Sequence, residues 1–419
     1  MLGILAACGS GTTGSGGSSG GTSSGPVTIK VATDLPVTGS DGTLGKSTEN
    51  GAHLAVDQAN SNHTIPNVTL QFDPMDDVGA SGVHDPAKGS QNVTSLVGDN
   101  LVAGIVGPFN SNVAKAEMGI TNAAPIVQIS PSNTNDCLTS SSAAVGCDGS
   151  NNLLPTLRPT GKVTYFRVCT TDSRQGPADA DFLYKKGYKR VYVVDDTEVY
   201  GVGLAKYFIP EWQKLGGTVI DHKSIKSTTS YVNLLTTIGA TKPDLVYFAG
   251  TFSTGGTLIR QQMLQVPALA NTAFGGGDGI DDSTFAKAVG GSGGPVYASI
   301  ASVDVTQTAA GKNFTAAYKS AYGSDVGPYS GAAYDAMNII IQGIKTAIGK
   351  VSAPKNSSDA SGGKAFRQAV IDAVAGISYN GVLGTTTFDS NGDTTNKVFT
   401  IQQVDSTGVW KTIATQTAQ

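Results

Sequence analysis

Short apolar runs alternate with amphipathic stretches from Val27 onward. The first runs are VTIKVATDLP at 27–36, VTLQFDP at 68–74, NLVAGIVGPFN at 100–110 and APIVQISP at 124–131. Between the first two runs, Ala52, Ala55, Val56 and Ala59 recur with the period of one helix face. This order predicts the strand–helix rhythm of a parallel sheet.

The rhythm restarts after Thr164 with a second set of apolar runs. These are YFRVCTT at 165–171, RVYVVDD at 190–196, GGTVIDHKSI at 216–225, DLVYFAG at 244–250 and TAFGGGD at 272–278. We expect one helix from Pro177 to about Gly187 and another from about Gly201 to Leu215, with proline inside the start and glycine past the end. The sequence therefore predicts an α/β fold of two doubly wound units.

The C-terminal part does not repeat this rhythm. Residues 330–349, SGAAYDAMNIIIQGIKTAIG, predict a long helix, and residues 381–404, GVLGTTTFDSNGDTTNKVFTIQQV, predict a hairpin. We expect these pieces to return and complete the earlier units. The chain would then cross between two lobes several times, and such crossings form a hinge.

Composition narrows the function classes. A chain of 419 residues is too long for one ordinary core, so two domains are expected. Its net charge is −4, with 14% charged residues and no basic stripe, so no nucleic-acid partner is expected. No apolar run reaches the 18 residues expected of a membrane-spanning helix.

Residues 1–8 end in LAAC, and a Gly/Ser/Thr-rich stretch follows at 9–26. A leucine, two small residues and a cysteine resemble the lipobox of bacterial lipoproteins. The resemblance implies lipidation of Cys8, a flexible tether at 9–26 and a folded part that is extracytoplasmic and attached to the membrane. Only seven residues precede Cys8, too few for a full signal peptide. The alternative is an unstructured leader with an incidental cysteine.

Cys137 and Cys147 bracket the polar loop LTSSSAAVG, and in an oxidising compartment we expect them to form a disulfide, with free thiols as the alternative. Cys169, in the apolar run YFRVC, reads as a buried small hydrophobic residue. The four histidines are scattered without the spacing of metal ligands, so no metal site is expected. They are His53, His63, His84 and His222.

Two further motif matches lack the structural features that their binding functions require. The G-x-G-x-x-G match that starts at Gly9 follows no strand, so we expect no dinucleotide or other cofactor. DSNGDTT at 389–395 lacks the glutamate that ends a calcium-binding loop, and it fits a hairpin turn better.

Several longer runs occur in a specific order. They are VTGSDGTLGKSTENGAHLAVDQAN at 37–60, GPFNS at 107–111, ISPSNT at 129–134, TTDSRQGPADADFLYKKGYKRVYVVDDTEVYGVGLA at 170–205 and PYSGAAYDAMN at 328–338. This order resembles the branched-chain amino acid binding protein family, the type I periplasmic solute-binding proteins of ABC importers, over nearly all of 27–413. The resemblance implies a Venus-flytrap architecture: two lobes joined by crossover strands, a ligand in the cleft and no catalytic residues. The lobes would be 27–164 with 303–379, and 165–302 with 380–419.

Three first-lobe residues match positions that this family uses for the α-carboxylate and part of the α-amino group of the ligand. Ser111 is expected to be an N-cap, and helix N-termini present free N–H groups to anions. Ser132 and Thr134 follow the next run and would lie at the carboxyl edge of the sheet, where ligands of open α/β sheets bind. Ordinary turn and capping chemistry is the alternative for all three.

In the second lobe, Asp278 aligns with the acidic residue that pairs with the ligand ammonium, and Tyr200 with an aromatic residue that lines the cleft. A solvated loop carboxylate and a helix-packing tyrosine are the alternatives. Two positions depart from the family: Leu44 and Thr251, with Phe252 beside it, stand where relatives carry tyrosines. Both concern the pocket for the ligand side chain, so leucine, isoleucine or valine cannot be assumed as ligand.

The resulting interpretation is a receptor that binds an amino acid or an analogue and delivers it to an ABC permease. Amides, urea and aromatic acids stay open as ligands of the same fold. A sensory subunit that signals to a membrane receptor is a second class. An α/β enzyme is a third, and it would need the acid–base cluster that the sequence does not suggest.

Overall fold

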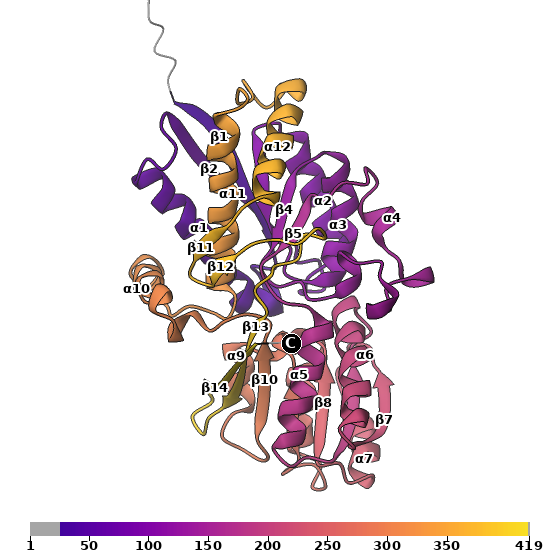
Figure 1. Ribbon diagram of the computed structural model, residues 1–419. Helices are drawn as coiled ribbons and strands as arrows, with labels where there is room; N and C mark the ends of the chain where they lie inside the picture. The colour runs from indigo at the N-terminus through magenta and orange to yellow at the C-terminus, as the bar shows by residue number, and fades with distance from the viewer. Residues whose placement is uncertain (1–25, 418–419) are drawn as a thin grey trace, which may run out of the picture.

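The computed structural model describes residues 26–417 and folds them into two α/β lobes, each built around its own sheet (Figure 1). The first sheet has five parallel strands in the order β2-β1-β3-β4-β5. Its inner strands β3 and β4 are buried throughout, as expected for strands with helices on both faces. The strands are β1 (Val27–Leu35), β2 (Val68–Asp76), β3 (Val102–Val106), β4 (Val127–Ser130) and β5 (Tyr165–Arg167).

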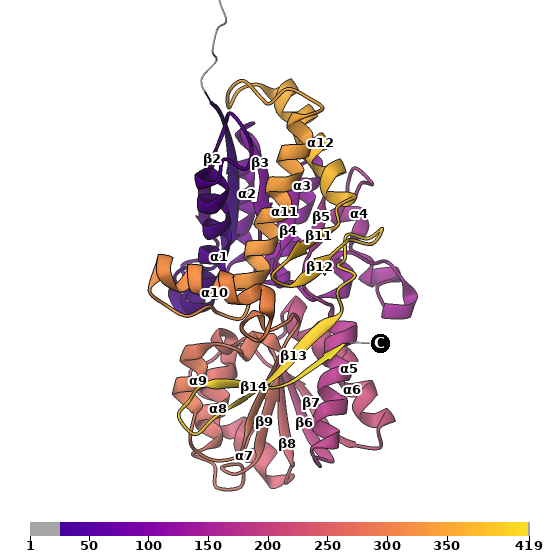
Figure 2. The same cartoon turned by 60° about the vertical axis from the view of Figure 1, so that its left-hand side comes forward.

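Helices cover both faces of this sheet. On one face α11 packs between α1 and α12, and on the other α2 packs against α3 (Figures 1 and 2). The predicted apolar face of α1, with Ala52, Ala55, Val56 and Ala59, is buried. These helices are α1 (Gly42–Ser61), α2 (Pro86–Gly98), α3 (Ser111–Ala123), α11 (Ser330–Ile348) and α12 (Ala360–Ala375), with the short α4 (Leu154–Leu157) and the peripheral α10 (Ala309–Tyr322) beside them.

The second sheet has seven strands in the order β14-β13-β10-β9-β8-β6-β7. Strands β6 to β10 run parallel, while β13 and β14 add an antiparallel edge. The strands are β6 (Arg190–Asp195), β7 (Thr218–Ser224), β8 (Leu245–Ala249), β9 (Ala273–Gly276), β10 (Val296–Ile300), β13 (Val398–Val404) and β14 (Trp410–Thr417).

The second-lobe helices include one whose start differs from the prediction. α5 begins at Asp172, not at Pro177, which lies inside it. The helix continues upstream because the Thr171 carbonyl accepts from the N–H groups of Arg174 and Gln175. The helices are α5 (Asp172–Lys185), α6 (Val199–Lys214), α7 (Val232–Ala240), α8 (Thr257–Met263) and α9 (Ser283–Val289). Within 26–417 no helix has both the length and the apolar character needed to cross a bilayer.

The chain passes between the lobes three times: between β5 and α5, between β10 and α10, and toward β13. The crossing segments are bonded to one another, with Thr170 N–H to Ala301 O at 2.9 Å and Arg167 N–H to Gly392 O at 3.0 Å. The sequence analysis begins the second lobe at residue 165. This residue lies in the first sheet, because β5 pairs with β4. The expected multiple crossings are therefore present.

The single hairpin expected at 381–404 is wrong as one unit, but the turn expected at 389–395 is present, since Phe388 forms an antiparallel bridge with Thr394. Two other pairings flank this turn. β11 (Tyr379–Gly381) pairs with β12 (Gly384–Thr386), and β13 pairs with β10 and β14. The buried carboxylate of Asp335 on α11 fixes the first turn, because it accepts from Val382 N–H at 3.0 Å and Leu383 N–H at 2.9 Å.

Candidate ligand-binding site

Asp278 lies at the centre of a buried hydrogen-bond cluster between the lobes. It follows β9 and is 4% exposed. Its Oδ1 accepts from Gln175 Nε2 and Tyr200 Oη, each at 2.9 Å, and its Oδ2 accepts from Tyr329 Oη at 2.9 Å. Tyr200 Oη in turn accepts from Gly279 N–H at 3.1 Å. The structure thus brings together Tyr200 and Asp278, both of which the sequence placed at the cleft.

Tyr329 and Gln175 are partners that the sequence reasoning did not single out. Tyr329 precedes α11 of the first lobe, so its bond to Asp278 crosses the cleft, whereas Gln175 lies on α5 of the second lobe. Both residues stand inside runs that carry the family resemblance, PYSGAAYDAMN and TTDSRQGPADAD. Membership of those runs is the signal that could have found them.

The electrostatics of Asp278 suit a cationic partner. Burial raises the pKa of its carboxyl, while the hydrogen bonds from Gln175, Tyr329 and Tyr200 lower it. All three donors are neutral groups. A buried carboxylate held by neutral donors gains further stabilisation from a cation, such as a ligand ammonium.

The glycines around Asp278 allow Tyr200 to approach it. A Cβ at Gly277 would lie 2.5 Å from Tyr200 Oη, and a Cβ at Gly279 would lie 2.8 Å from Tyr200 Cε1. This glycine run leaves room for the tyrosine that binds the carboxylate.

Ser111, Ser132 and Thr134 lie on the first lobe. Ser111 is the first residue of α3, and the N-cap is Asn110, not Ser111 as predicted, because Asn110 has the extended backbone of a cap. The Asn110 side chain makes no capping bond, so it leaves the first-turn N–H groups for other partners. Ser132 Oγ donates to Phe109 O at 2.9 Å. Thr134 is fully buried.

Several buried polar atoms near these residues have no hydrogen-bond partner among residues 26–417. They are Asn110 Oδ1, Thr134 Oγ1, Gln175 Oε1 and both carboxylate oxygens of Asp172. Asp172 N–H donates to Thr134 O at 2.8 Å, which links the two lobes' residues here, and Gln175 also contacts Asp278. Leaving buried polar atoms unpaired costs stability, so a ligand with both donors and acceptors would be favoured here.

Leu44 and Thr251, the two departures from the family, meet across the cleft. They line one small cavity of about 10 Å³ with Phe109, Phe252 and Gly279. That volume holds about one water molecule. The lobes are therefore closed on each other, and a larger ligand enters only if they separate or these side chains move.

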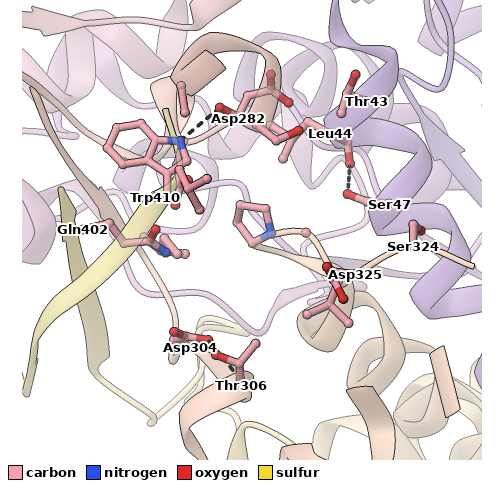
Figure 3. Close-up of a pocket in the computed structure, with 18 of the residues that line it drawn as sticks. Thr43, Leu44, Ser47, Asp282, Asp304, Thr306, Ser324, Asp325, Gln402 and Trp410 are labelled. Carbon is pink, nitrogen blue, oxygen red and sulfur yellow. Dashed lines mark hydrogen bonds between the residues drawn. The ribbon is translucent and has the colours of Figure 1, made fainter. Parts of the chain in front are cut away.

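A second, much wider groove of about 810 Å³ runs between the lobes beside this cavity. Leu44 lines both spaces. Figure 3 shows the groove, with Thr43, Leu44 and Ser47 of α1 on one side and Trp410 of β14 on the other. Its volume is in the range of small-molecule pockets.

A histidine contact also bridges the lobes. His84 Nδ1 lies 2.9 Å from Asp41 Oδ2 in the first lobe, and Nε2 lies 2.8 Å from Glu198 Oε2, just before α6 of the second. Burial lowers the pKa of His84, but the hydrogen bonds to Asp41 and Glu198 outweigh it and raise the pKa well above the ordinary value. A protonated His84 therefore favours the closed arrangement.

The cysteines fall in three places. Cys137 and Cys147 form a disulfide, with Cα atoms 5.1 Å apart. Cys169 is a buried free thiol. Cys8, expected to carry the lipid, lies outside the described residues.

Comparison with known proteins agrees with this arrangement. The family model described as periplasmic binding protein matches residues 28–409. The Leu/Ile/Val-binding protein BraC3 of Rhizobium johnstonii is 29% identical over 61% of this chain and 63% of its own length. The Leu/Ile/Val-binding protein homolog 3 of Brucella melitensis is 26% identical over 90% of this chain and 91% of its own.

Solved structures show the same fold. The leucine binding protein LivK of Thermotoga maritima superposes with a TM-score of 0.75 at 22% identity, over 93% of this chain and 99% of its own. A solute binding protein of R. palustris in complex with benzoate superposes with a TM-score of 0.72 at 19% identity, over 93% of this chain and 97% of its own. The chain therefore belongs to the periplasmic binding protein family and, within it, to the type I group that contains the branched-chain amino acid binding proteins.

Proposed function

We propose that this protein is an extracytoplasmic receptor that binds a small amino-acid-like solute between its lobes and delivers it to an ABC importer. The observation that carries the proposal is the Asp278 carboxylate, which is buried in the cleft and held by neutral donors from both lobes. Such a carboxylate is matched by the ammonium of an amino acid. The Streptococcus pneumoniae LivJ structure, a relative in fold, was solved with isoleucine.

We assign the remaining ligand groups from the family resemblance. Ser111, Ser132 and Thr134 take the carboxylate at the first lobe, and Asp278 with Tyr200 takes the ammonium at the second. Leu44 and Thr251 face the ligand side chain from opposite lobes. A ligand that contacts both lobes stabilises the closed state through its higher affinity for that state.

The place of action follows from the N-terminal sequence. Lipidation at Cys8 would anchor the chain to the outer face of the cytoplasmic membrane, and residues 9–26 would tether the lobes there. An importer in the same membrane is then within reach of the closed receptor.

A receptor for an aromatic carboxylic acid is the second candidate. Phe109 and Phe252 line the small cavity, and the Phe109 ring packs edge-on against Tyr329 with centroids 5.5 Å apart. The R. palustris relative in fold was solved with benzoate. A ligand of this kind has no ammonium for Asp278.

A thermal-shift panel on the parent and on Asp278→Asn tests both candidates. The panel holds the common amino acids, small amides, urea and aromatic acids. A ligand at 100 times its Kd stabilises the folded state by about 2.7 kcal/mol. We expect amino acids to raise the Tm of the parent and to lose affinity in Asp278→Asn. Asp335→Asn is the matched control, because this buried carboxylate accepts from the backbone N–H groups of Val382 and Leu383 and makes no contact with the Asp278 cluster.

The outcomes separate the candidates. If only aromatic acids bind, and they bind the parent and Asp278→Asn equally, the protein is a receptor for aromatic carboxylic acids and not for amino acids. If an amino acid binds Asp278→Asn as tightly as it binds the parent, the ammonium role of Asp278 is wrong.

A further inference from the structure

Three carboxyl groups meet inside the first lobe, away from the Asp278 cluster. Asp34 lies near the end of β1, Asp77 directly follows β2, and Glu117 lies on α3. All three residues are 0% exposed. One oxygen from each lies within 4.8 Å of the others. Sequence spacing did not reveal this group, because the three residues come from separate elements.

Two amide side chains hold the outer oxygens of this group. Asn92 Nδ2 of α2 donates to Asp34 Oδ1 at 2.8 Å, and Gln128 Nε2 of β4 donates to Glu117 Oε2 at 2.5 Å. The Gln128 amide is itself oriented by Thr121, whose hydroxyl donates to Gln128 Oε1 at 2.8 Å. Amide donors to a carboxylate favour its ionised form and fix its direction, as the residues behind metal ligands do.

The inner oxygens have no such donors. Among residues 26–417, Asp34 Oδ2, Glu117 Oε1 and both oxygens of Asp77 have no hydrogen-bond partner. Asp77 is thus a fully buried carboxyl group to which no group in the described part of the chain donates at either oxygen. Nearby His84 does not supply one, since its ring nitrogens contact Asp41 and Glu198. Buried carboxylates need a cation or a proton to offset their desolvation.

We propose that Asp34, Asp77 and Glu117 bind one divalent metal ion, and that the ion is Ca²⁺. An all-oxygen set of carboxylates selects hard cations over zinc or copper. Calcium–oxygen distances of about 2.3–2.6 Å place opposite ligands roughly 4.6–5.2 Å apart, which accommodates the spread of these oxygens. Magnesium favours bonds of about 2.0–2.1 Å in near-ideal octahedral geometry, a stricter demand than the flexible coordination of calcium.

The proposed ion would stiffen the loop that leads to the ligand site. The loop passes tightly over Asp34, where a Cβ at Gly107 would lie 2.2 Å from Asp34 O. Phe109 follows in this loop, and α3, which carries Glu117, begins at Ser111. The ion would thus stabilise the first lobe whether or not a solute is bound.

The test is calcium binding by the full chain after removal of metal with EDTA and dialysis. Thermal unfolding and isothermal titration calorimetry are run with CaCl₂ and MgCl₂ at millimolar concentrations and without any solute. We expect Ca²⁺ to raise the Tm and to bind with a stoichiometry near one. Mg²⁺ should bind more weakly.

Three variants locate the ion. Asp77→Asn and Glu117→Gln keep the size of the side chain and remove one charge, so each should weaken Ca²⁺ binding by about tenfold or more. Without calcium, Asp77→Asn should be at least as stable as the parent, because carboxylate repulsion is relieved. Asp335→Asn is the matched control: a buried first-lobe carboxylate whose two oxygens both have backbone donors. It should respond to calcium like the parent even if its Tm is lower.

Two results would overturn the proposal. One is the absence of any calcium-dependent Tm shift or heat in the parent, which would mean that the three carboxyls share protons instead. The other is a calcium response that persists unchanged in both Asp77→Asn and Glu117→Gln, which would place the ion elsewhere.

Discussion

A single phenol hydroxyl joins the two lobes at the proposed ammonium site. Tyr329 comes from the first lobe and donates to Asp278 of the second at 2.9 Å, while its ring packs on Phe109. A hydrogen bond to a charged, buried acceptor contributes about 1.5–3 kcal/mol. Because this bond joins residues of different lobes, we expect its free energy to add to closure more than to the folding of either lobe.

We therefore expect Tyr329→Phe to lower ligand affinity by roughly tenfold to a hundredfold and to leave the Tm of the ligand-free protein almost unchanged. Calorimetry and thermal unfolding check the two parts. Tyr322→Phe is the control, since the Tyr322 hydroxyl is buried without a hydrogen-bond partner among residues 26–417. Equal affinity in parent and Tyr329→Phe would contradict the bridging role.

At this scale the sequence predicted half of the cluster. Asp278 and Tyr200 were found because each aligns with a family position. Tyr329 and Gln175 also lie in runs that match the family, but they are 51 and 103 residues away from Asp278, and the apolar pattern does not indicate contacts of that range.

Among the elements, the crossing segments depend on one buried arginine. Arg167 at the end of β5 is fully buried, and its Nε contacts Asp393 Oδ1 at 2.7 Å. Its Nη1 donates to the carbonyls of Asn133 at 2.9 Å and Asn135 at 2.8 Å. One side chain thus links the segment after β4, the first crossing and the third.

We expect Arg167→Met to lower the free energy of unfolding by about 3–5 kcal/mol, because the buried partners of Arg167 lose their donor. Urea denaturation followed by circular dichroism measures the change. Arg190→Met is the control: Arg190 is exposed, bonds only peripheral groups, and should change stability by about 0.5 kcal/mol or less. Similar losses in both variants would contradict an anchoring role for Arg167.

The elements themselves were largely readable from the pattern of apolar residues. Strands appear as apolar runs because parallel strands are buried on both faces. The start of α5 was missed because a proline inside a helix was taken for its first residue. The single hairpin predicted at 381–404 is wrong because the position of the first turn is set by Asp335, far away on α11.

At the scale of the molecule, His84 couples closure of the lobes to pH. Its pKa is raised well above the ordinary value of 6.5 when Asp41 and Glu198 both contact it. Opening separates His84 from Glu198, so part of that rise disappears. A raised pKa in the closed state means that protonation favours closure. The stabilisation of the closed state by protonated His84 is fully present below the ordinary histidine pKa. It is lost as the pH rises through the raised pKa of His84 in the closed state.

Ligand affinity should therefore fall as the pH increases above neutrality, and His84→Gln should have a lower affinity with a flatter pH profile. Calorimetric titrations across the alkaline range measure both. His53→Gln, which removes a half-buried histidine on α1 that stacks on Phe72, should keep the slope of the parent. A parent affinity that does not depend on pH would contradict this coupling.

The order of the elements also has a consequence for biosynthesis. The first sheet is complete by Arg167, but α11 and α12, which cover one of its faces, come from residues 330–375. The second sheet receives its last two strands only from residues 398–417. Until then the edge of β10 and one face of the first sheet stay uncovered, and uncovered edges and apolar faces promote aggregation. The first lobe therefore cannot reach its final form before residue 375 has been translated, nor the second before residue 417, and the emerging chain keeps an aggregation-prone edge and face until then.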